Sequence, residues 1–225
     1  MNGLVSVAQL SLAKSGFLLQ HTAVEVGNVK GIAGATIISR KSDSGIDIFF
    51  DKKIIHESFE LKNRGVINDI ALLHLNESVI FSEKTDIRAI CLPPKNHFTN
   101  RTTASILFHE DKDEENDKVS FSLVDKINNT FCHGLLKENY LENVLFCAGH
   151  RRASSSCLKD TGGPFMESKN YRNYVTGIVS YECRCHSSYG LTVFTNVSYF
   201  VPWIEKQTNI TSFNPMTEVK SNKVQ

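Results

Sequence analysis

The sequence predicts an all-β protein that ends in one helix, and two patterns along the chain support this. The apolar segments are short, rich in β-branched and aromatic residues, and bounded by Gly, Asn, Ser or Asp. They are SGFLLQHTAVEV (15–26), GATIISR (34–40), IDIFFDKKII (46–55), DIALLHL (69–75), YVTGIVSY (174–181) and LTVFTNV (191–197). Several are apolar on both faces, as expected where a sheet closes on itself and packs against a second sheet.

The segment VSYFVPWIEKQTNI (197–210) follows a different pattern, because its apolar residues recur at helical spacing with charged residues between them. Pro202 lies near its start, where a helix tolerates proline best. This segment is therefore predicted to be a closing helix. The tail, residues 212–225, is polar and aperiodic and is predicted to be disordered.

One internal boundary stands out, at CLPPKNHFTNRTT (91–103). Pro93 and Pro94 cannot sit inside a hydrogen-bonded ladder, and the flanking residues are polar. A chain of 225 residues with 41% hydrophobic residues can bury a substantial core. We expect one structural unit over 1–211, made of a first half (1–90), a linker (91–103) and a second half with the helix (104–211).

Charge excludes two classes of partner. Lys and Arg total 25 and Asp and Glu total 24, so the formal net charge of +1 gives no reason to expect nucleic acid or an anionic membrane. No segment is apolar enough to span a bilayer. The first 20 residues make a poor signal peptide, because they lack a basic start and Lys14 interrupts their apolar run.

The six cysteines predict disulfides rather than a metal site, since they form neither paired CxxC motifs nor a Cys/His array. We expect neither a metal nor a cofactor. Five Asn-x-Ser/Thr sequons further indicate a secreted glycoprotein. The sequons begin at Asn76, Asn100, Asn128, Asn196 and Asn209.

Segments that occur in order along nearly the whole chain resemble the trypsin-like serine protease family, most closely its clotting-factor branch. They are NDIALLHL (68–75), CLPP (91–94), FCAG (146–149), CLKDTGGP (157–164), VTGIVSY (175–181) and VFTNVSYFVPWI (193–204). The resemblance implies two antiparallel Greek-key β-barrels with an active site between them and a C-terminal helix. Because the chain begins seven residues before Ala8, we expect an N-terminal barrel without its first strand, in a fragment or a zymogen-like domain.

In this family a serine attacks the carbonyl, a histidine takes its proton, an aspartate orients the histidine, and backbone amides bind the oxyanion. The resemblance places Asp69 at the aspartate position and Thr161 at the nucleophile position. An ungapped alignment of residues 11–24 places Ala23 at the base position. An alternative places His21 there, but it requires two residues to be deleted from a strand and turn and restored later.

Further substitutions affect the nucleophile turn and the pocket. Thr161 keeps a hydroxyl but adds a methyl that stiffens χ1, and Lys159 replaces the oxyanion-hole glycine. Asp160 matches the carboxylate that pairs with a newly cut N-terminus, and here it would be buried without that partner. The pocket positions implied by the resemblance are Ser155, Lys159, Tyr181, Glu182 and Thr192. Ser155 gives no support for Arg or Lys substrates, and Glu182 and Thr192 should narrow the pocket.

The resemblance also implies which cysteines form disulfides. It implies disulfides between Cys132 and Cys147 and between Cys157 and Cys185. Cys91 matches the cysteine that ties the family's protease domain to an upstream chain, and Cys183 is an additional cysteine that could replace Cys185.

The functional prediction is a secreted, catalytically inactive protease homologue that binds or regulates another protein through its loops. The charged loop HEDKDEENDK (109–118) and HRR (150–152) are the predicted contact surfaces. The alternative is a weak endopeptidase that uses Thr161 with His21 and Asp69. A third possibility is a poorly folding product, in which the missing first strand exposes a sheet edge.

Overall fold

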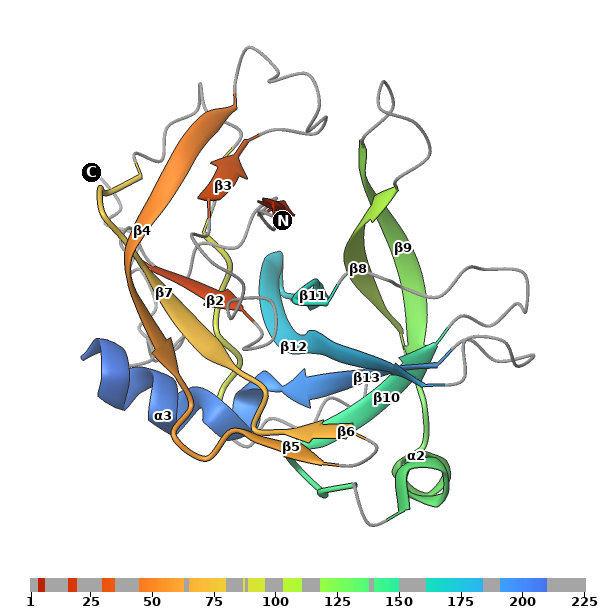
Figure 1. Cartoon of the computed structure of the whole chain (residues 1–225). Helices are drawn as coiled ribbons and strands as arrows, with labels where there is room; N and C mark the ends of the chain where they lie inside the picture. The colour runs from red at the N-terminus through yellow and green to blue at the C-terminus, as the bar shows by residue number, and fades with distance from the viewer. Residues whose placement is uncertain are drawn as a thin grey trace, which may run out of the picture.

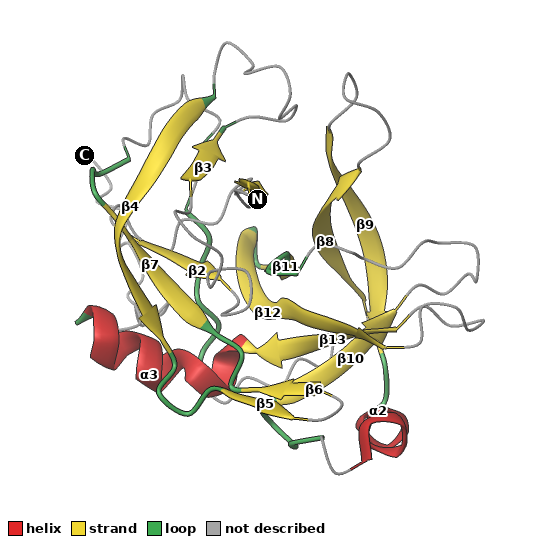
Figure 2. Cartoon of the chain, in the orientation of Figure 1, coloured by secondary structure: helices red, strands yellow, loops and turns green. Residues whose placement is uncertain are grey.

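The computed structural model describes residues 4–6, 16–19, 30–34, 45–62, 65–79, 87, 89–95, 103–110, 118–137, 140–149, 161–183 and 191–209. Figure 1 shows two β structures side by side, with the last helix, α3, packed against the first of them. Figure 2 shows that strands dominate both. The predicted all-β fold with a closing helix is confirmed.

The first half of the chain forms a five-stranded sheet in the order β1-β3-β4-β7-β2. Its strands are β1 (Leu4–Ser6), β2 (Gly16–Leu19), β3 (Lys30–Ala33), β4 (Ile46–Ile55) and β7 (Ala71–Leu75). A short hairpin of β5 (Glu60–Lys62) and β6 (Gly65–Ile67) lies between β4 and β7 in sequence. Strand β4 changes register between Phe50 and Lys52, and such a bulge bends a strand.

The edge of this sheet differs from the prediction of purely antiparallel strands. β1 pairs with β3 in parallel, with Val5 opposite Gly31, whereas the other pairs of the sheet are antiparallel. β1 therefore covers the outer edge of β3, the kind of edge that would otherwise offer unpaired backbone groups.

The second half forms a closed antiparallel barrel of six strands in the order β10-β13-β12-β11-β8-β9. The strands are β8 (Thr103–Glu110), β9 (Lys118–Lys126), β10 (Leu145–Gly149), β11 (Pro164–Lys169), β12 (Arg172–Cys183) and β13 (Leu191–Asn196). The β8–β9 ladder continues to Glu110 opposite Lys118, so the ends of the predicted charged loop 109–118 are strand residues.

Two helices complete the fold. α3 (Val197–Thr208) confirms the predicted closing helix and ends at Asn209, which has a φ of 53°. The sequence did not predict α2 (Asn129–Leu136), a helix of eight residues after β9. No helix of the described residues is long and apolar enough to cross a membrane.

The core has two parts. One lies inside the closed barrel, where Phe146 and Phe194 stack with their ring centroids 5.2 Å apart and Phe165 meets both rings edge-on. The other is larger and is built from both halves, with Ile70 and Leu72 of the first sheet in the same cluster as Val193 and Phe200. This shared core holds the two halves together.

The linker after residue 90 is bonded to strand β12 and to helix α3. Cys91 N–H donates to the Asn173 carbonyl at 2.9 Å, and Val175 N–H donates to the Cys91 carbonyl at 3.0 Å, so this residue pairs with β12. Four residues later, Lys95 Nζ lies 2.6 Å from Glu205 Oε2 on α3.

Candidate active site

Asp69 lies where the first sheet meets the closed barrel. Its side chain is 0% exposed, and it follows Asn68, whose φ of 53° marks a turn before β7. The Ser180 hydroxyl donates to Asp69 Oδ2 at 2.6 Å, and the Thr195 hydroxyl donates to the Asp69 carbonyl at 3.0 Å. Two strands of the second half, β12 and β13, therefore hold an aspartate of the first half.

The hydrogen bond from Ser180 offsets part of the cost of burying the Asp69 carboxyl group. Burying a carboxylate costs several kcal/mol unless hydrogen bonds compensate it. A hydroxyl aimed at one of its oxygens is a charge-assisted donor, stronger than a bond between neutral groups. Sequence reasoning did not single out Ser180, although a hydroxyl residue inside the strand VTGIVSY is the kind of polar exception that signals a specific partner.

Thr161 lies on an exposed turn that is fixed against β12. The turn continues into Gly162, which is buried with a φ of 89°, a conformation that favours glycine. Gly162 N–H donates to the Val179 carbonyl at 2.9 Å, and Val179 N–H donates to the Gly163 carbonyl at 2.8 Å. Val179 directly precedes Ser180, so the turn that carries Thr161 is bound next to the residue that contacts Asp69.

The predicted pocket positions on β12 and β13 are paired with one another. Glu182 lies opposite Thr192 in the ladder, and the Thr192 side chain is buried. Tyr181 is half-buried, and its ring lies so close to Gly65 that a Cβ added there would come within 2.8 Å of the Tyr181 hydroxyl oxygen. The β5–β6 hairpin of the first half thus packs directly on the pocket strand.

Several predicted site residues lie outside the described residues. These are His21, Ala23, Ser155, Lys159, Asp160, Cys157 and Cys185, together with the segment 150–152 and the sequon at Asn100. The structure therefore places Asp69, Thr161, Tyr181 and Thr192, together with the backbone of Glu182. Their assignment to a degenerate active site stays a prediction.

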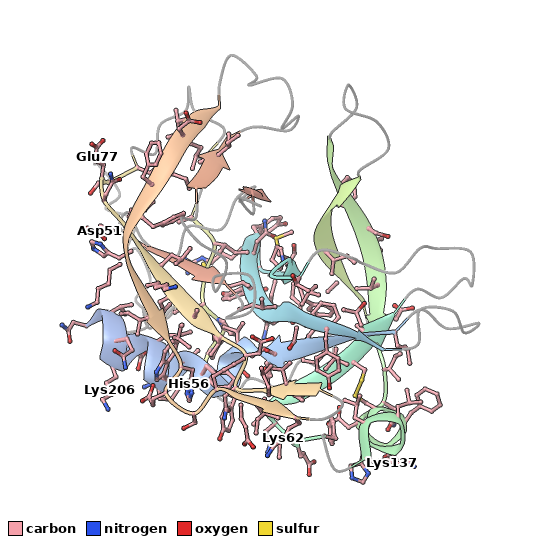
Figure 3. The ribbon with its side chains drawn as sticks, viewed as in Figure 1. Asp51, His56, Lys62, Glu77, Lys137 and Lys206 are labelled. Atoms are coloured by element: carbon pink, nitrogen blue, oxygen red, sulfur yellow. A yellow bond between two sulfur atoms is a disulfide. The ribbon has the colours of Figure 1, made fainter. Side chains whose placement is uncertain are left out.

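The structure contains a disulfide between Cys132 and Cys147, the pair that the resemblance implies. Both residues are buried, and their Cα atoms are 5.7 Å apart, within the usual range for this bond. The bond connects α2 to β10, as Figure 3 shows beside α2. Cys91 is a half-buried free cysteine.

A second buried carboxylate lies inside the closed barrel and was missed from sequence. Glu167 of β11 is 4% exposed, and its charge acts on Lys126 of β9. Burial lowers the pKa of Lys126, and the Glu167 charge partly opposes this shift. Lys126 Nζ also lies 4.9 Å from the centre of the Phe146 ring, within the range of a cation–π contact.

A cluster of aromatic rings around His56 anchors α3 to the first half. His56, at the end of β4, lies beside α3 (Figure 3), with its ring 5.2 Å from that of Phe200 and 4.9 Å from that of Trp203. Ser58 N–H donates to His56 Nδ1 at 3.2 Å, and Trp203 Nε1 donates to Glu57 Oε2 at 2.7 Å. Burial lowers the pKa of His56, and the Glu57 charge partly opposes this.

The closed barrel, the aspartate buried at its junction with a second β structure and the Thr-Gly-Gly turn beside it define a chymotrypsin-like double-barrel fold. The family model described as Trypsin matches residues 9–204 of the chain. The protein therefore belongs to the trypsin family of serine proteases and their homologues.

Three curated relatives support this assignment. CLIP domain-containing serine protease B4 of Anopheles gambiae is 30% identical over 176 residues, which are 73% of this chain and 48% of the relative. Phenoloxidase-activating factor 3 of Holotrichia diomphalia is 30% identical over 173 residues, 73% of this chain and 48% of the relative. CLIP domain-containing serine protease B8 of Anopheles gambiae is 27% identical over 184 residues, which are 74% of this chain and 45% of the relative. The chain spans about half the length of the curated relatives it matches.

Proposed function

We propose that the protein is a secreted, catalytically inactive member of the trypsin family that binds and regulates another protein. Two features support this proposal: the ordered scaffold around the turn of Thr161, and the predicted replacement of the reacting groups. Asp69 keeps a hydroxyl donor from Ser180, and Gly162 keeps its left-handed turn. Thr161 stands at the nucleophile position, and the alignment places Ala23 at the base and Lys159 at the oxyanion hole.

The chemistry of this combination is unfavourable for hydrolysis. A threonine hydroxyl becomes an effective nucleophile only when a base stands beside it. Loss of one oxyanion donor lowers kcat by about 10²- to 10³-fold. Replacement of the base and of the oxyanion glycine in the same chain therefore leaves little beyond the binding contribution of the cleft.

Secretion is supported by two features. Buried disulfides such as Cys132–Cys147 persist in oxidising compartments and are rare in the cytosol. The five sequons can be glycosylated only if the chain enters the secretory pathway.

The partner we propose is a protein that takes part in protease-dependent activation, since one relative is named a phenoloxidase-activating factor. The outward face of β9 supports a protein contact there. Phe121 is 73% exposed and Leu123 is 61% exposed, and alternate residues of a strand share one face. Phe121 and Leu123 closely follow the charged segment 109–118 in the sequence. We propose that the two form the contact surface together, with residues 150–152 as a second candidate and Cys91 as the attachment point of an upstream chain.

A peptidase assay tests the catalytic part of the proposal. The purified chain is incubated with a panel of fluorogenic peptide esters and amides, with Thr161→Ala as the matched control. We expect both proteins to show the same background rate. Turnover by the native chain that disappears in Thr161→Ala would overturn the proposal.

The competing function is a weak endopeptidase that uses Thr161, His21 and Asp69. The exposed position of Thr161 beside the strand of Ser180 favours it, since a nucleophile must be accessible. It predicts that His21→Ala abolishes turnover and that the rate rises through a histidine pKa. Equal rates for the native chain and for His21→Ala exclude it.

The regulatory part is tested by adding the purified chain to an active trypsin-family protease and its proenzyme substrate. We expect the activation rate to change, and we expect the change to be lost in the variant with Phe121→Ser and Leu123→Ser. An unchanged activation rate across the tested proteases would contradict the regulatory role.

A further inference from the structure

We propose that Asn128 carries an N-linked glycan whose first sugar lies in an open hollow on one face of α2, over the exposed ring of Phe131, and that Asn196 carries none. This inference rests on the proposed entry of the chain into the secretory pathway. It selects among the sequons by their geometry, which the sequence cannot do.

Asn128 is the residue that caps the N-terminus of α2. Its Oδ1 accepts a hydrogen bond of 2.7 Å from the backbone N–H of Thr130, the third residue of its own sequon. The cap uses only the oxygen of the side-chain amide. Asn128 and Thr130 are both exposed, and the hydrogen bond to Oδ1 holds the amide in one orientation while leaving Nδ2 out of the cap.

A hollow of about 580 Å³ adjoins this amide. It is lined by Asn128, Thr130, Phe131, Gly134 and Leu135. Residues three apart on a helix lie on the same face, which brings Asn128 and Phe131 together. Phe131 is 52% exposed, and Gly134 has open space where a Cβ would be. The surface of the hollow is more apolar than polar, so it suits the C–H face of a pyranose ring.

The occupant is fixed by its attachment. A sugar bonded to Asn128 Nδ2 is covalently held at the rim of the hollow, so its effective concentration there is high and even a weak contact with Phe131 is populated. The polar edge of the sugar remains in water. Phe131 would otherwise be an exposed aromatic ring on a helix surface with no role in the core.

Asn196 shows the opposite geometry. Its Nδ2 donates to the Asn143 carbonyl at 2.7 Å, and its Oδ1 accepts from the Ser198 hydroxyl at 2.9 Å. Both ends of the amide therefore hold the junction of β13 and α3. Asn196 is half-buried and Ser198 is 1% exposed, so a glycan there would have to displace the chain around Asn143. Asn76, by contrast, is exposed at the end of β7 and serves as a comparison site.

The modification itself requires a sugar donor of a defined class, a polyprenyl diphosphate-linked oligosaccharide. Asn128 Nδ2 loses one proton and forms a C–N bond with the anomeric carbon of the first N-acetylglucosamine. The bond between that carbon and the phosphate oxygen breaks, and polyprenyl diphosphate leaves with its electron pair. The Oδ1 atom that caps α2 takes no part, so the cap survives the reaction.

Site occupancy is measured on the full chain expressed behind a secretion leader in a eukaryotic host. Peptide-N-glycosidase in oxygen-18 water converts each glycosylated Asn to an Asp whose carboxyl group carries the heavy oxygen, which peptide mass spectrometry detects. We expect label at Asn128 and none at Asn196. Asn128 without label, or Asn196 with label, overturns the inference, whether or not Asn76 is labelled. Because the leader delivers the chain to the glycosylation machinery, this result is independent of natural secretion, which is tested separately with the native transcript in its own cells.

Thr130→Ala is the matched variant. It removes the sequon but keeps the cap, because the donor to Asn128 Oδ1 is the backbone N–H of residue 130. Thr130→Ser keeps both. We expect loss of one glycan mass in Thr130→Ala and full retention in Thr130→Ser.

The contact with Phe131 is tested by trimming the glycans to a single N-acetylglucosamine and comparing melting temperatures with those of Thr130→Ala. We expect the sugar at Asn128 to raise Tm by roughly 2 °C, the order of shift that one surface contact gives in a chain of this size. The shift should vanish in Phe131→Ser and persist in Phe121→Ser, a more exposed phenylalanine that does not line the hollow. An equal shift in both variants would show that the sugar does not lie on Phe131.

Discussion

The Ser180 hydroxyl donates a hydrogen bond of 2.6 Å to Asp69 Oδ2 across a sequence separation of 111 residues. It joins the closed barrel to the first half of the chain, at the residue that we predict to match the catalytic aspartate of the trypsin family. This bond has a structural consequence that can be measured separately from activity.

Ser180→Ala should destabilise the fold. The change removes one charge-assisted donor from a buried carboxylate, a loss of about 1 to 3 kcal/mol in the free energy of unfolding. Urea denaturation measures it. Ser168→Ala removes a hydroxyl hydrogen bond on the exposed end of β11 and serves as the control, with an expected loss within about 0.5 kcal/mol. If the two variants lose the same free energy of unfolding, the hydrogen bond to Asp69 contributes no more than an exposed one.

Gly177→Ala should be severely destabilising although it adds a single methyl group. A Cβ at this position of β12 would lie 2.6 Å from a ring carbon of Phe146 and 3.1 Å from Phe165 Cβ, inside the aromatic core of the barrel. Overpacking of this kind costs about 1 to 3 kcal/mol. The matched control is Gly134→Ala, where nothing lies within 4 Å and alanine favours the helix. If the melting temperature of Gly177→Ala equals or exceeds that of Gly134→Ala, the close packing of Gly177 against the aromatic core is contradicted.

Acidification should weaken the attachment of α3 through His56. Burial lowers the pKa of His56 in the folded protein below its value in the unfolded chain. Between the folded-state pKa and the unfolded value of about 6.5, the unfolded state binds more protons than the folded state. The free energy of unfolding is therefore highest above about pH 6.5 and falls as the pH drops from there toward the folded-state pKa. His56→Gln should flatten the dependence of Tm on pH between about 7 and 5. Above about pH 7.5 the two curves should run parallel, and a persistent difference in slope there would assign the effect to another group.

Removal of the disulfide between Cys132 and Cys147 should lower stability through the unfolded state. The bond closes a loop with a sequence separation of 15, for which the chain-entropy estimate is about 3 kcal/mol. The variant with Cys132→Ala and Cys147→Ala is compared with Cys91→Ala by guanidinium denaturation, because Cys91 is free. A reductant should lower the midpoint of the native chain by more than that of the double variant, which keeps the predicted bond between Cys157 and Cys185. A midpoint of the native chain that does not respond to reductant would count against the bond.

Thr161→Ser alone should not create a peptidase. It removes the methyl that crowds the turn, but the alignment still places Ala23 at the base and Lys159 at the oxyanion hole. The variant with Ala23→His, Lys159→Gly and Thr161→Ser should hydrolyse activated peptide esters faster than any of its single substitutions, because triad members act as a unit. Activity in Thr161→Ser alone would reveal a base already in place and would favour His21.

Local patterns in the sequence predicted several of the strands and the last helix. Residues 46–55 form β4 over the whole predicted range, and α3 runs over Val197–Thr208 where 197–210 was expected. Short apolar runs with turn residues at both ends carry this information locally. The helix α2 was missed because eight residues give too few repeats of a helical pattern, although Asn128 and Thr130 form its cap.

Contacts between distant segments could not be predicted from one sequence. The motifs suggested Asp69 and Thr161, but neither the donor Ser180 nor the packing of Gly65 on Tyr181 leaves a trace in local periodicity. The parallel pairing of β1 with β3 is of the same kind, since strand order depends on which edges remain open after the rest of the sheet has formed. Glu167 was missed because a buried charge breaks the rule that predicts burial.

The linker at residues 91–95 differs from a flexible hinge. Both backbone groups of Cys91 are bonded to β12, and Lys95 is paired with Glu205 of α3. A pivoting motion of one barrel against the other would have to break these bonds as well as open the shared core. The position of the first sheet relative to the closed barrel is therefore fixed when the chain folds, and a partner that contacts both must bind them in this one arrangement.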